Sequence, residues 1–182
     1  DPFCDPFCGS GTLPIEAALI ARNRAPGLGR AFDAQRWGCV PGRVWMDAAE
    51  EAMDREFHGE YDIWGGDIDP RAVAIARENA RKAEGEDIVR FEVADMAALR
   101  RSSEYGQLVT NPPYGERLLD EKEARALYRS FGEMCRHLPP RWRVLALTSD
   151  ESFEKAFGRR ADKRRKLYNG RLKCELYFFQ NN

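Results

Sequence analysis

The sequence predicts an α/β fold with a mostly parallel sheet, helices on both faces and an antiparallel hairpin at the carboxyl-terminal edge. Short apolar strand patterns alternate with amphipathic helix patterns along most of the chain. A glycine-containing turn joins a strand pattern to a helix pattern near residue 10. Asn169-Gly170 separates the last two strand patterns, and this dipeptide is the strongest short-range signal for a hairpin.

Size and composition suit one globular domain. The chain has 182 residues, of which 43% are hydrophobic and 32% are charged, a balance typical of a chain that buries a core. No apolar run approaches the ~20 residues of a membrane helix, and no stretch resembles a secretion leader. The five cysteines are an odd count at scattered spacings. We therefore expect no disulfide framework and a cytoplasmic protein.

Charge is distributed unevenly along the chain. The formal net charge is −1, yet the stretch from Lys155 to Lys173 holds nine Lys or Arg residues and one Asp. A chain polarised in this way can hold nucleic acid at one edge while the rest stays acidic. A solvated surface is the alternative interpretation of such a run, and the residues leave that choice open.

The amino-terminal half alternates helices and a strand. A helix is expected over residues 13–23, directly after the turn, and an amphipathic helix over 43–57. The stretch between them is rich in Pro and Gly and too long for a tight turn, so we expect it to pack across one face of the sheet. A strand over 61–66 precedes Pro70, which suits a first helical turn. The helix that follows has an apolar face of Ala72, Val73, Ile75, Ala76 and Ala80.

The carboxyl-terminal half alternates in the same way until the hairpin. Residues 88–93 alternate apolar and polar side chains, and 108–110 form a short apolar strand. A helix is expected over 121–138, because apolar side chains recur there at i, i+3 and i+4. The remaining expected elements are a buried strand over 144–147, a short helix over 151–157, and hairpin strands over 165–168 and 172–179.

The glycine turn indicates a ligand and excludes two ligand classes. Gly9-Ser10-Gly11 precedes a helix, where backbone can approach a ligand closely. A dinucleotide fingerprint needs a third glycine where Pro14 stands, and an acid roughly 20 residues downstream. A phosphate-binding loop needs Gly-Lys-Ser/Thr, which the sequence lacks. The turn therefore predicts neither a nicotinamide dinucleotide nor a nucleoside triphosphate.

Three acidic residues at predicted strand ends indicate which ligand the turn holds. Asp5 suits a cationic group, Asp67 suits a ribose diol, and Asp95 suits an adenine amino group. An ammonium, a ribose and an adenine together describe S-adenosylmethionine. Any one of these acids is equally well a cap or a turn residue, but all three in this order favour the cofactor.

Asn111-Pro112-Pro113-Tyr114 is the most specific motif in the chain. Two prolines stiffen the loop and leave carbonyl oxygens free. The Asn111 side-chain oxygen and the Pro112 carbonyl oxygen can accept both hydrogens of a conjugated exocyclic amine, which orients its lone pair and stabilises the charge that develops on nitrogen. Tyr114 offers a ring on which a flipped base can stack. The motif predicts N-methyl transfer without a strong base; a rigid proline turn with a packing tyrosine is the alternative.

Three segments carry a family resemblance. Residues 5–18 resemble the first motif of class I methyltransferases, in particular of the RNA methylases that have an N-terminal THUMP domain. Residues 25–30, with Phe32 and Trp37, resemble an insertion typical of that group; 66–72 resemble its second motif and 111–117 its catalytic motif. The resemblance covers nearly the whole chain. It implies a Rossmann-like, seven-stranded sheet and methyl transfer from S-adenosylmethionine to N2 of a guanine in ribosomal RNA.

Motifs and resemblance together define the expected site. The cofactor-binding residues are Asp5, Phe7, Cys8, Gly9, Ser10, Gly11, Thr12, Asp67, Ile68, Asp95, Met96 and Asn111. Asp69 is a second candidate near the ribose, ranked behind Asp67 because Asp67 ends the strand. The catalytic residues are Asn111, Pro112, Pro113 and Tyr114, and the substrate-binding residues are Tyr114, Arg117, Lys163, Arg164 and Arg165. We expect no metal, because Cys and His are few and lack ligand spacing.

Two alternatives stay open. The same catalytic motif serves adenine N6 in DNA or a glutamine amide in a protein, and the insertion at 25–30 is what favours RNA. Residues 1–182 are also expected to be a catalytic domain without a THUMP or other RNA-binding region, which makes a cofactor-binding fragment without activity the second alternative. Finally, Asp-Pro-Phe-Cys occurs twice in tandem. The second copy continues into the glycine turn, whereas the first replaces an apolar strand, and we interpret it as extraneous.

Overall fold

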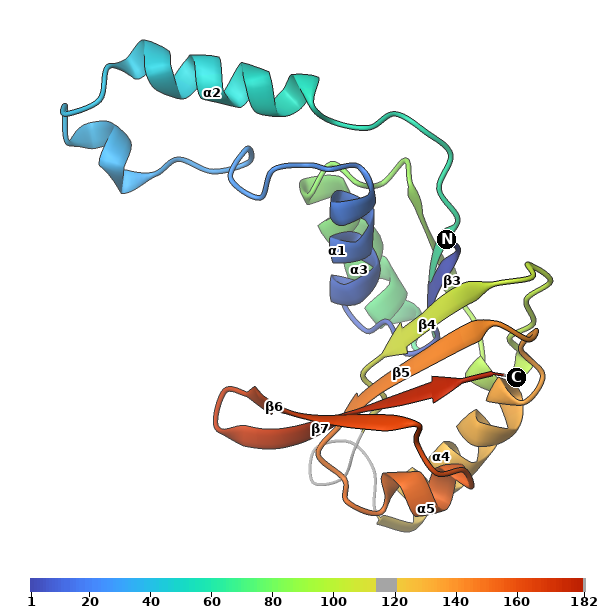
Figure 1. Cartoon of the computed structure of the whole chain (residues 1–182). Coiled ribbons are helices and arrows are strands. Elements are labelled where there is room, and N and C mark those ends of the chain that lie inside the picture. Colours follow the sequence, from blue (N-terminus) through green and yellow to red (C-terminus); the bar gives the residue numbers. More distant parts are fainter. Residues whose placement is uncertain (114–120, 182) are drawn as a thin grey trace.

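The computed structural model describes residues 1–113 and 121–181, and its centre is a seven-stranded sheet in the order β3-β2-β1-β4-β5-β7-β6 (Figure 1). Strands β1 to β5 run parallel, and β7 is antiparallel to both β5 and β6. The expected parallel sheet with a terminal hairpin is confirmed. The strands are β1 (Phe3–Asp5), β2 (Ile63–Asp67), β3 (Val89–Val93), β4 (Gly106–Thr110), β5 (Trp142–Thr148), β6 (Lys163–Asn169) and β7 (Leu172–Gln180).

Helices cover both faces of the sheet. On one face, α1 (Thr12–Ala21) and α3 (Pro70–Lys82) bury their apolar sides against β1, β2 and β3. On the other face, α4 (Glu121–Cys135) and α5 (Phe153–Phe157) form a larger core with β4, β5 and β7. The 3-10 turn η2 (Met96–Ala98) follows β3. No helix in the described ranges has the length and apolar character needed to cross a membrane.

The order of the strands determines where a ligand site can form. The chain runs outward from β1 through β2 to β3, and then returns to the other side of β1 as β4. Connections leave in opposite directions from β1 and β4, which opens a crevice at their carboxyl ends. The glycine turn follows β1, Asp67 ends β2, and Asn111 follows β4. All three sequence motifs therefore meet at one edge of the sheet.

The first Asp-Pro-Phe-Cys copy contributes to the sheet. Phe3 lies beside Ile63 on one side and Gln107 on the other, and Cys4 is fully buried. Backbone hydrogen bonds from Phe3 N to Asp62 O (2.8 Å) and from Gln107 N to Pro2 O (2.9 Å) pair it with both neighbours. The same tetrapeptide thus has two structures, a strand in the first copy and a turn in the second.

The expectation that the segment after α1 packs across the sheet is wrong. Residues 25–55, which we call the arm, extend away from the sheet (Figure 1) and contain η1 (Asp33–Arg36) and α2 (Gly42–Asp54). No residue of α2 is buried. The Phe32 ring stacks on Trp45 with 6.0 Å between ring centroids. This contact holds the two limbs of the arm to each other and not to the sheet.

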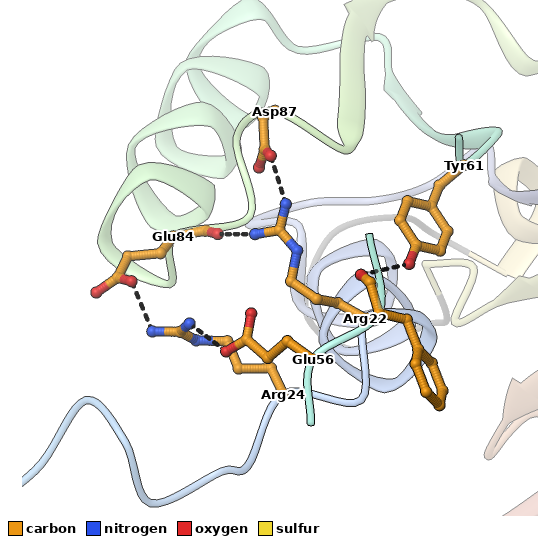
Figure 2. A network of polar contacts seen from close by, with 7 residues as sticks. Arg22, Arg24, Glu56, Tyr61, Glu84 and Asp87 are labelled. Atoms are coloured by element: carbon orange, nitrogen blue, oxygen red, sulfur yellow. Dashed lines mark hydrogen bonds and ion pairs between the residues drawn. The ribbon is translucent and has the colours of Figure 1, made fainter. Parts of the chain in front are cut away.

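Polar contacts fasten the base of the arm (Figure 2). Arg24 forms ion pairs with Glu56 at 2.7 Å and with Glu84 at 2.6 Å. Arg22 pairs with Asp87 and donates to the Glu84 carbonyl oxygen at 3.0 Å. The two chains at the base are joined directly, because Phe57 N donates to Arg22 O at 2.7 Å. These contacts tie the arm to the end of α1 and to the loop between α3 and β3.

Candidate active site

The glycine turn is shaped by positive backbone angles and close packing. Gly11 has φ +85°, and a Cβ there would lie 2.8 Å from the Phe91 ring and 2.9 Å from the Ala76 Cβ, so no other residue fits without movement. Gly9 has φ +52°, but nothing lies within 4 Å of its missing Cβ. The turn is thus closed toward α3 and open at Gly9, where a ligand can approach the backbone.

Asp67 connects the end of β2 to this turn. Its Oδ2 accepts a hydrogen bond from Gly9 N at 3.0 Å, and its Oδ1 accepts one from Asp69 N at 2.9 Å. Beside it, Ile68 is 72% exposed and offers an uncovered apolar surface. Asp69 caps α3 by accepting from Arg71 N at 2.9 Å. This placement favours Asp67 over Asp69 as the carboxylate that faces a ligand in the turn.

Asn79, on α3, supports the glycine turn, and the sequence did not indicate this role. Its Nδ2 donates to Ser10 O at 2.9 Å and so attaches the turn to α3. Ser10 and Thr12 are exposed, and their hydroxyl oxygens lie 3.4 Å apart. An asparagine within an amphipathic helix has no distinguishing spacing, so only the fold reveals this contact.

Asp5 lies inside the protein and joins two strands. Its side chain is 2% exposed, and its Oδ1 accepts from the Thr110 hydroxyl at 2.5 Å and from Phe7 N at 3.1 Å. Burial raises the pKa of Asp5 to about 7, against the lowering effect of these two hydrogen bonds. Asp67 adds a smaller upward effect on that pKa. Asp5 therefore links the cofactor-type turn after β1 to the residue that precedes Asn111.

The Asn111 loop is supported by a tyrosine of α4. Asn111 is exposed, Pro112 is buried and Pro113 is half-buried. The Tyr128 hydroxyl, from α4, donates to the Pro113 carbonyl oxygen at 3.1 Å, and the Tyr128 ring is fully buried against Phe153. The hydrogen bond and the packing of Tyr128 thus hold the loop that carries the Asn111 amide and the Pro112 carbonyl in place. Tyr114 and Arg117 lie outside the described residues.

Tyr128 is the second functional candidate that the sequence missed. It lies on the core side of a helix whose periodicity is otherwise apolar. A tyrosine at such a position carries a hydroxyl that needs a partner. The need of this hydroxyl for a hydrogen-bond partner is the one signal in the sequence that could have indicated Tyr128.

The other expected cofactor residues differ in what their side chains do. Phe7 is half-buried, and its ring meets the Phe131 ring edge to face, with 5.5 Å between the ring centroids. Cys8 and Met96 are 6% and 5% exposed, respectively, and belong to the two cores. Burial raises the pKa of Cys8 to about 12, so its thiol stays neutral. These three positions offer mainly backbone to a ligand, whereas Asp95 is exposed and accepts from Ala97 N at 2.9 Å.

The basic hairpin residues do not form one patch, because neighbours on a strand alternate between its faces. Arg164 stacks over the Tyr177 ring at 5.4 Å and pairs with Glu154 of α5. Lys163 lies over Phe178, on the opposite face. Arg165 is in register with Leu176, also on that opposite face. Arg164 borders a cleft of about 280 Å³ at the carboxyl end of β5, lined also by Thr148, Asp150, Lys173, Glu175 and Tyr177.

The residues around the turn fit S-adenosylmethionine chemically. Gly9 leaves its approach open, Asp67 presents a carboxylate beside it, and Ile68 presents an uncovered apolar side chain. Ribose hydroxyls suit the carboxylate, and an adenine ring suits the apolar surface. In the part of the chain that the structure describes, no group of three His, Cys, Asp or Glu side chains is arranged to hold a metal ion.

Comparisons with known proteins also indicate a methyltransferase domain. The family model described as "RMKL-like, methyltransferase domain" matches residues 1–177. The chain is 42% identical over 177 residues to the "Putative RNA methyltransferase YpsC" of Bacillus subtilis, covering 97% of this chain and 46% of that protein. It is 42% identical over 180 residues to the ribosomal RNA large subunit methyltransferase K/L of Shewanella baltica, covering 96% of this chain and 25% of that protein.

Solved structures agree with this chain in fold, and each is about twice as long. The structure described as "SMU.472, a putative methyltransferase complexed with SAH" matches with TM-score 0.94 at 43% identity, over 100% of this chain and 48% of that one. A Listeria monocytogenes protein described as "a predicted N6-adenine-specific DNA methylase" matches with TM-score 0.91 at 46% identity, over 100% of this chain and 47% of that one. The chain thus spans half or less of the length of these relatives. Matching sequence, matching fold and the three motifs at one edge of the sheet place the chain in the family of RMKL-like methyltransferase domains.

Proposed function

We propose that the protein transfers a methyl group from S-adenosylmethionine to the exocyclic N2 amine of a guanine in ribosomal RNA. One observation carries this proposal. The buried bond between Asp5 and Thr110, 2.5 Å long, joins the glycine turn to the Asn111 loop. Donor turn and acceptor loop therefore lie beside each other, as transfer between two bound molecules requires.

In the cofactor site, each residue has a distinct role. Asp67 binds the ribose hydroxyls while it holds Gly9, and the open side of Gly9 admits the ligand. Ile68 and the backbone at Met96 border the adenine, and Asp95 accepts from the adenine amino group. The buried carboxyl of Asp5 orients the turn by accepting a hydrogen bond from Phe7 N. Its negative charge attracts the ammonium group of the cofactor. When bound, S-adenosylmethionine supplies an electrophilic methyl group on sulfur.

At the acceptor loop, the chain positions and activates a weak nucleophile. The Asn111 side-chain oxygen and the Pro112 carbonyl oxygen accept the two amine hydrogens, which turns the nitrogen lone pair outward. Both oxygens also stabilise the positive charge that grows on nitrogen during attack. The proton leaves after transfer, so no strong base is needed. Tyr128 keeps the prolines in place, and Tyr114 supplies the ring for the flipped base.

RNA is the acceptor we favour among three planar amines. The same oxygens suit adenine N6 in DNA and a glutamine amide in a protein. Two relatives at 42% identity are named for RNA methylation, and the similar Listeria protein is named for DNA adenine. The basic stretch at the hairpin supports a polyanion. Arg164, which lines the cleft at the carboxyl end of β5, is proposed to contact RNA together with Arg117. Lys163 and Arg165, on the opposite face of β6, are proposed to contact RNA on that face.

The decisive experiment changes the acceptor loop alone. Asn111→Ala removes one of the two acceptors and leaves the turn intact, so turnover is expected to fall by at least 100-fold. Because Asn111 contributes less to the cofactor site than the turn does, affinity for S-adenosylmethionine is expected to fall by no more than about threefold. Asn111→Asp keeps an oxygen acceptor and is expected to retain more turnover than Asn111→Ala. Radiolabelled methyl transfer measures turnover, and titration calorimetry measures affinity.

The same assay separates the acceptors. Ribosomal RNA, duplex DNA and a glutamine-containing protein are offered in parallel, and the labelled nucleoside is identified after digestion. Label confined to DNA adenine or to protein would refute the RNA assignment. Cofactor binding without transfer to any acceptor would support the second alternative, a fragment that needs a further RNA-binding region. Normal turnover of Asn111→Ala would refute the roles given to the loop.

A further inference from the structure

A buried side-chain bond connects β1 to β4 at the edge where the crevice opens. In the described part of the chain, backbone pairing between these two strands ends at Cys4 and Leu108. Beyond that point, the Thr110 hydroxyl donates to Asp5 Oδ1 at 2.5 Å, and both side chains are almost fully buried. On its other side, β4 stays paired with β5 as far as Thr110 and Ala146. The bond between Asp5 and Thr110 thus ties the end of β4 to the strand that enters the glycine turn.

Each partner in this bond leads directly to one half of the site. Asp5 Oδ1 also accepts from Phe7 N at 3.1 Å, in the segment that continues to Gly9. Thr110 is followed at once by Asn111, whose side-chain oxygen is proposed to hold the acceptor amine. A threonine side chain is stiff at χ1, so a pull on its hydroxyl is passed to its backbone. A change at Asp5 therefore reaches the acceptor loop through one hydrogen bond.

Asp5 can respond to the cofactor through its second carboxyl oxygen. Among the described residues, no donor meets Oδ2, although the side chain is buried. A buried carboxylate oxygen without a partner is costly, and the ammonium group of S-adenosylmethionine would supply both a donor and a positive charge. Burial raises the pKa of Asp5 to about 7, and Asp67 adds a smaller upward effect. A cation at Oδ2 acts against both and shifts the carboxyl toward its ionised form.

Ionisation of the carboxyl changes the bond on its other oxygen. A hydrogen bond to an ionised acceptor is roughly twice as strong as one between neutral groups. We therefore propose that Thr110 is a positioning residue that couples the two halves of the site. The cofactor's ammonium group, bound at Asp5, strengthens the hydrogen bond to Thr110 and so orders the acceptor loop for the incoming amine. The inference rests on the proposed cofactor site.

Coupling of this kind is reciprocal. If the cofactor strengthens acceptor binding by some factor, the acceptor strengthens cofactor binding by the same factor. An acceptor loop that becomes ordered only when the donor is present also favours binding of the cofactor before the RNA. Couplings between two sites typically amount to 5- to 150-fold in affinity, and we expect a factor of at least about fivefold here.

Two ligands separate the ammonium group from the rest of the cofactor. S-adenosylhomocysteine keeps the adenine, the ribose and the amino-acid group but has no methyl group to transfer. 5′-Methylthioadenosine keeps the adenine, the ribose and the sulfur but has no ammonium group. Hydrogen exchange of the backbone amides of residues 109–111, followed by NMR at saturation with each ligand, reports the order of this segment. S-adenosylhomocysteine is expected to slow exchange at least fivefold more than 5′-methylthioadenosine does.

Variants of two buried threonines test whether the hydroxyl carries the effect. Thr110→Val keeps the shape and removes the donor, so both ligands should then slow exchange equally. Thr110→Ser keeps the hydroxyl and should retain most of the difference between the ligands. Thr148→Val is the matched control, because Thr148 is equally buried at the end of β5 and its hydroxyl accepts from Asp150 N at 3.1 Å.

A purely structural role predicts a different result for these variants. Both valine variants would then lose stability in urea, and both would keep the difference between the ligands. The coupling predicts that only Thr110→Val loses that difference. Calorimetry verifies that S-adenosylhomocysteine saturates every variant.

RNA binding measures the same coupling at the acceptor. The affinity for a guanine-containing fragment of ribosomal RNA is determined without ligand and with each ligand at saturation. S-adenosylhomocysteine should tighten binding at least fivefold and 5′-methylthioadenosine less than twofold. In Thr110→Val, the effect of S-adenosylhomocysteine should fall below twofold. If the chain alone does not retain the RNA, the exchange measurement decides.

Separate results would overturn the coupling and the proposed function. Equal slowing of exchange by both ligands in the wild-type chain would overturn the coupling, and so would a difference that persists in Thr110→Val. Methyl transfer to RNA alongside either result would leave the proposed function standing. Coupled exchange with label confined to DNA or protein would instead overturn the RNA assignment and leave the coupling standing. Failure of S-adenosylhomocysteine to bind would overturn both.

Discussion

Asp5→Asn isolates the energetic effect of the buried carboxyl beneath the active site. The amide oxygen can still accept from Thr110 and Phe7, but the side chain no longer titrates. In the wild-type chain the pKa of Asp5 is about 7 when folded, against an ordinary value of 3.8. The unfolded chain therefore loses this proton first, so the folded state binds more protons between about pH 4 and pH 7. The contribution of Asp5 to wild-type stability therefore falls as the pH rises through that window.

The size of the effect follows from the same two values. Each pKa unit is worth about 1.4 kcal/mol, so the penalty grows from near zero at pH 4 to on the order of 4 kcal/mol by pH 8. Asp5→Asn is free of that penalty. Its free energy of unfolding is expected to match wild type at pH 4 and to exceed it increasingly up to pH 8.

Urea unfolding at pH 4.5, 6 and 8 measures this difference, with the buried Trp64 and Trp142 as fluorescent probes. Thr110→Val completes a double-mutant cycle. Without the hydroxyl, ionised Asp5 loses a charge-assisted hydrogen bond worth about 1.5–3 kcal/mol, so this substitution should cost more at pH 8 than at pH 5. In the Asp5→Asn background its cost should not depend on pH. A constant offset between wild type and Asp5→Asn from pH 4.5 to pH 8 would refute the reasoning.

Two further predictions concern the turn and the loop. Asp67→Asn keeps only one acceptor for Gly9 N and Asp69 N, so affinity for S-adenosylmethionine, measured by calorimetry, should fall 10- to 100-fold. The control, Asp69→Asn, should change this affinity less than threefold. A larger loss in the control would favour Asp69 as the ribose ligand. Tyr128→Phe removes the donor to Pro113 O, so kcat should fall about tenfold with KM for the cofactor unchanged. Its control is Tyr61→Phe, which removes a similar bond to Phe57 O at the base of the arm; equal kcat in both variants would mean that Tyr128 does not position the loop.

Local patterns were sufficient for most of the elements. The alternation in 88–93 and the Asn169-Gly170 signal both led to strands of the observed sheet, because strand period and turn chemistry are properties of neighbouring residues. The glycine turn was located for the same reason. Gly11 is required by its φ of +85° and by the Phe91 ring behind it, and glycine itself marks such a position in a sequence.

The arm shows where local patterns are insufficient. Its residues have an amphipathic period, which in most chains means packing on the same molecule. Here no residue of α2 is buried, since the contacts at Arg22 and Arg24 direct the segment outward. The first Asp-Pro-Phe-Cys copy is a second case in which tertiary pairing matters more than the local pattern. Two apolar residues are enough for a strand when neighbouring strands pair with it on both sides.

By itself, the sequence determined the class of fold, the glycine turn, the order of the acidic residues and the Asn-Pro-Pro motif, because each depends on residue type and short spacing. Tertiary structure alone decided which of these groups touch. It buried Asp5 against Thr110, brought Tyr128 under Pro113 and separated Arg164 from Lys163 and Arg165. The physical reason is that hydrogen bonds and burial join residues that are 15 to 105 positions apart in the chain, and no local pattern records such a pairing.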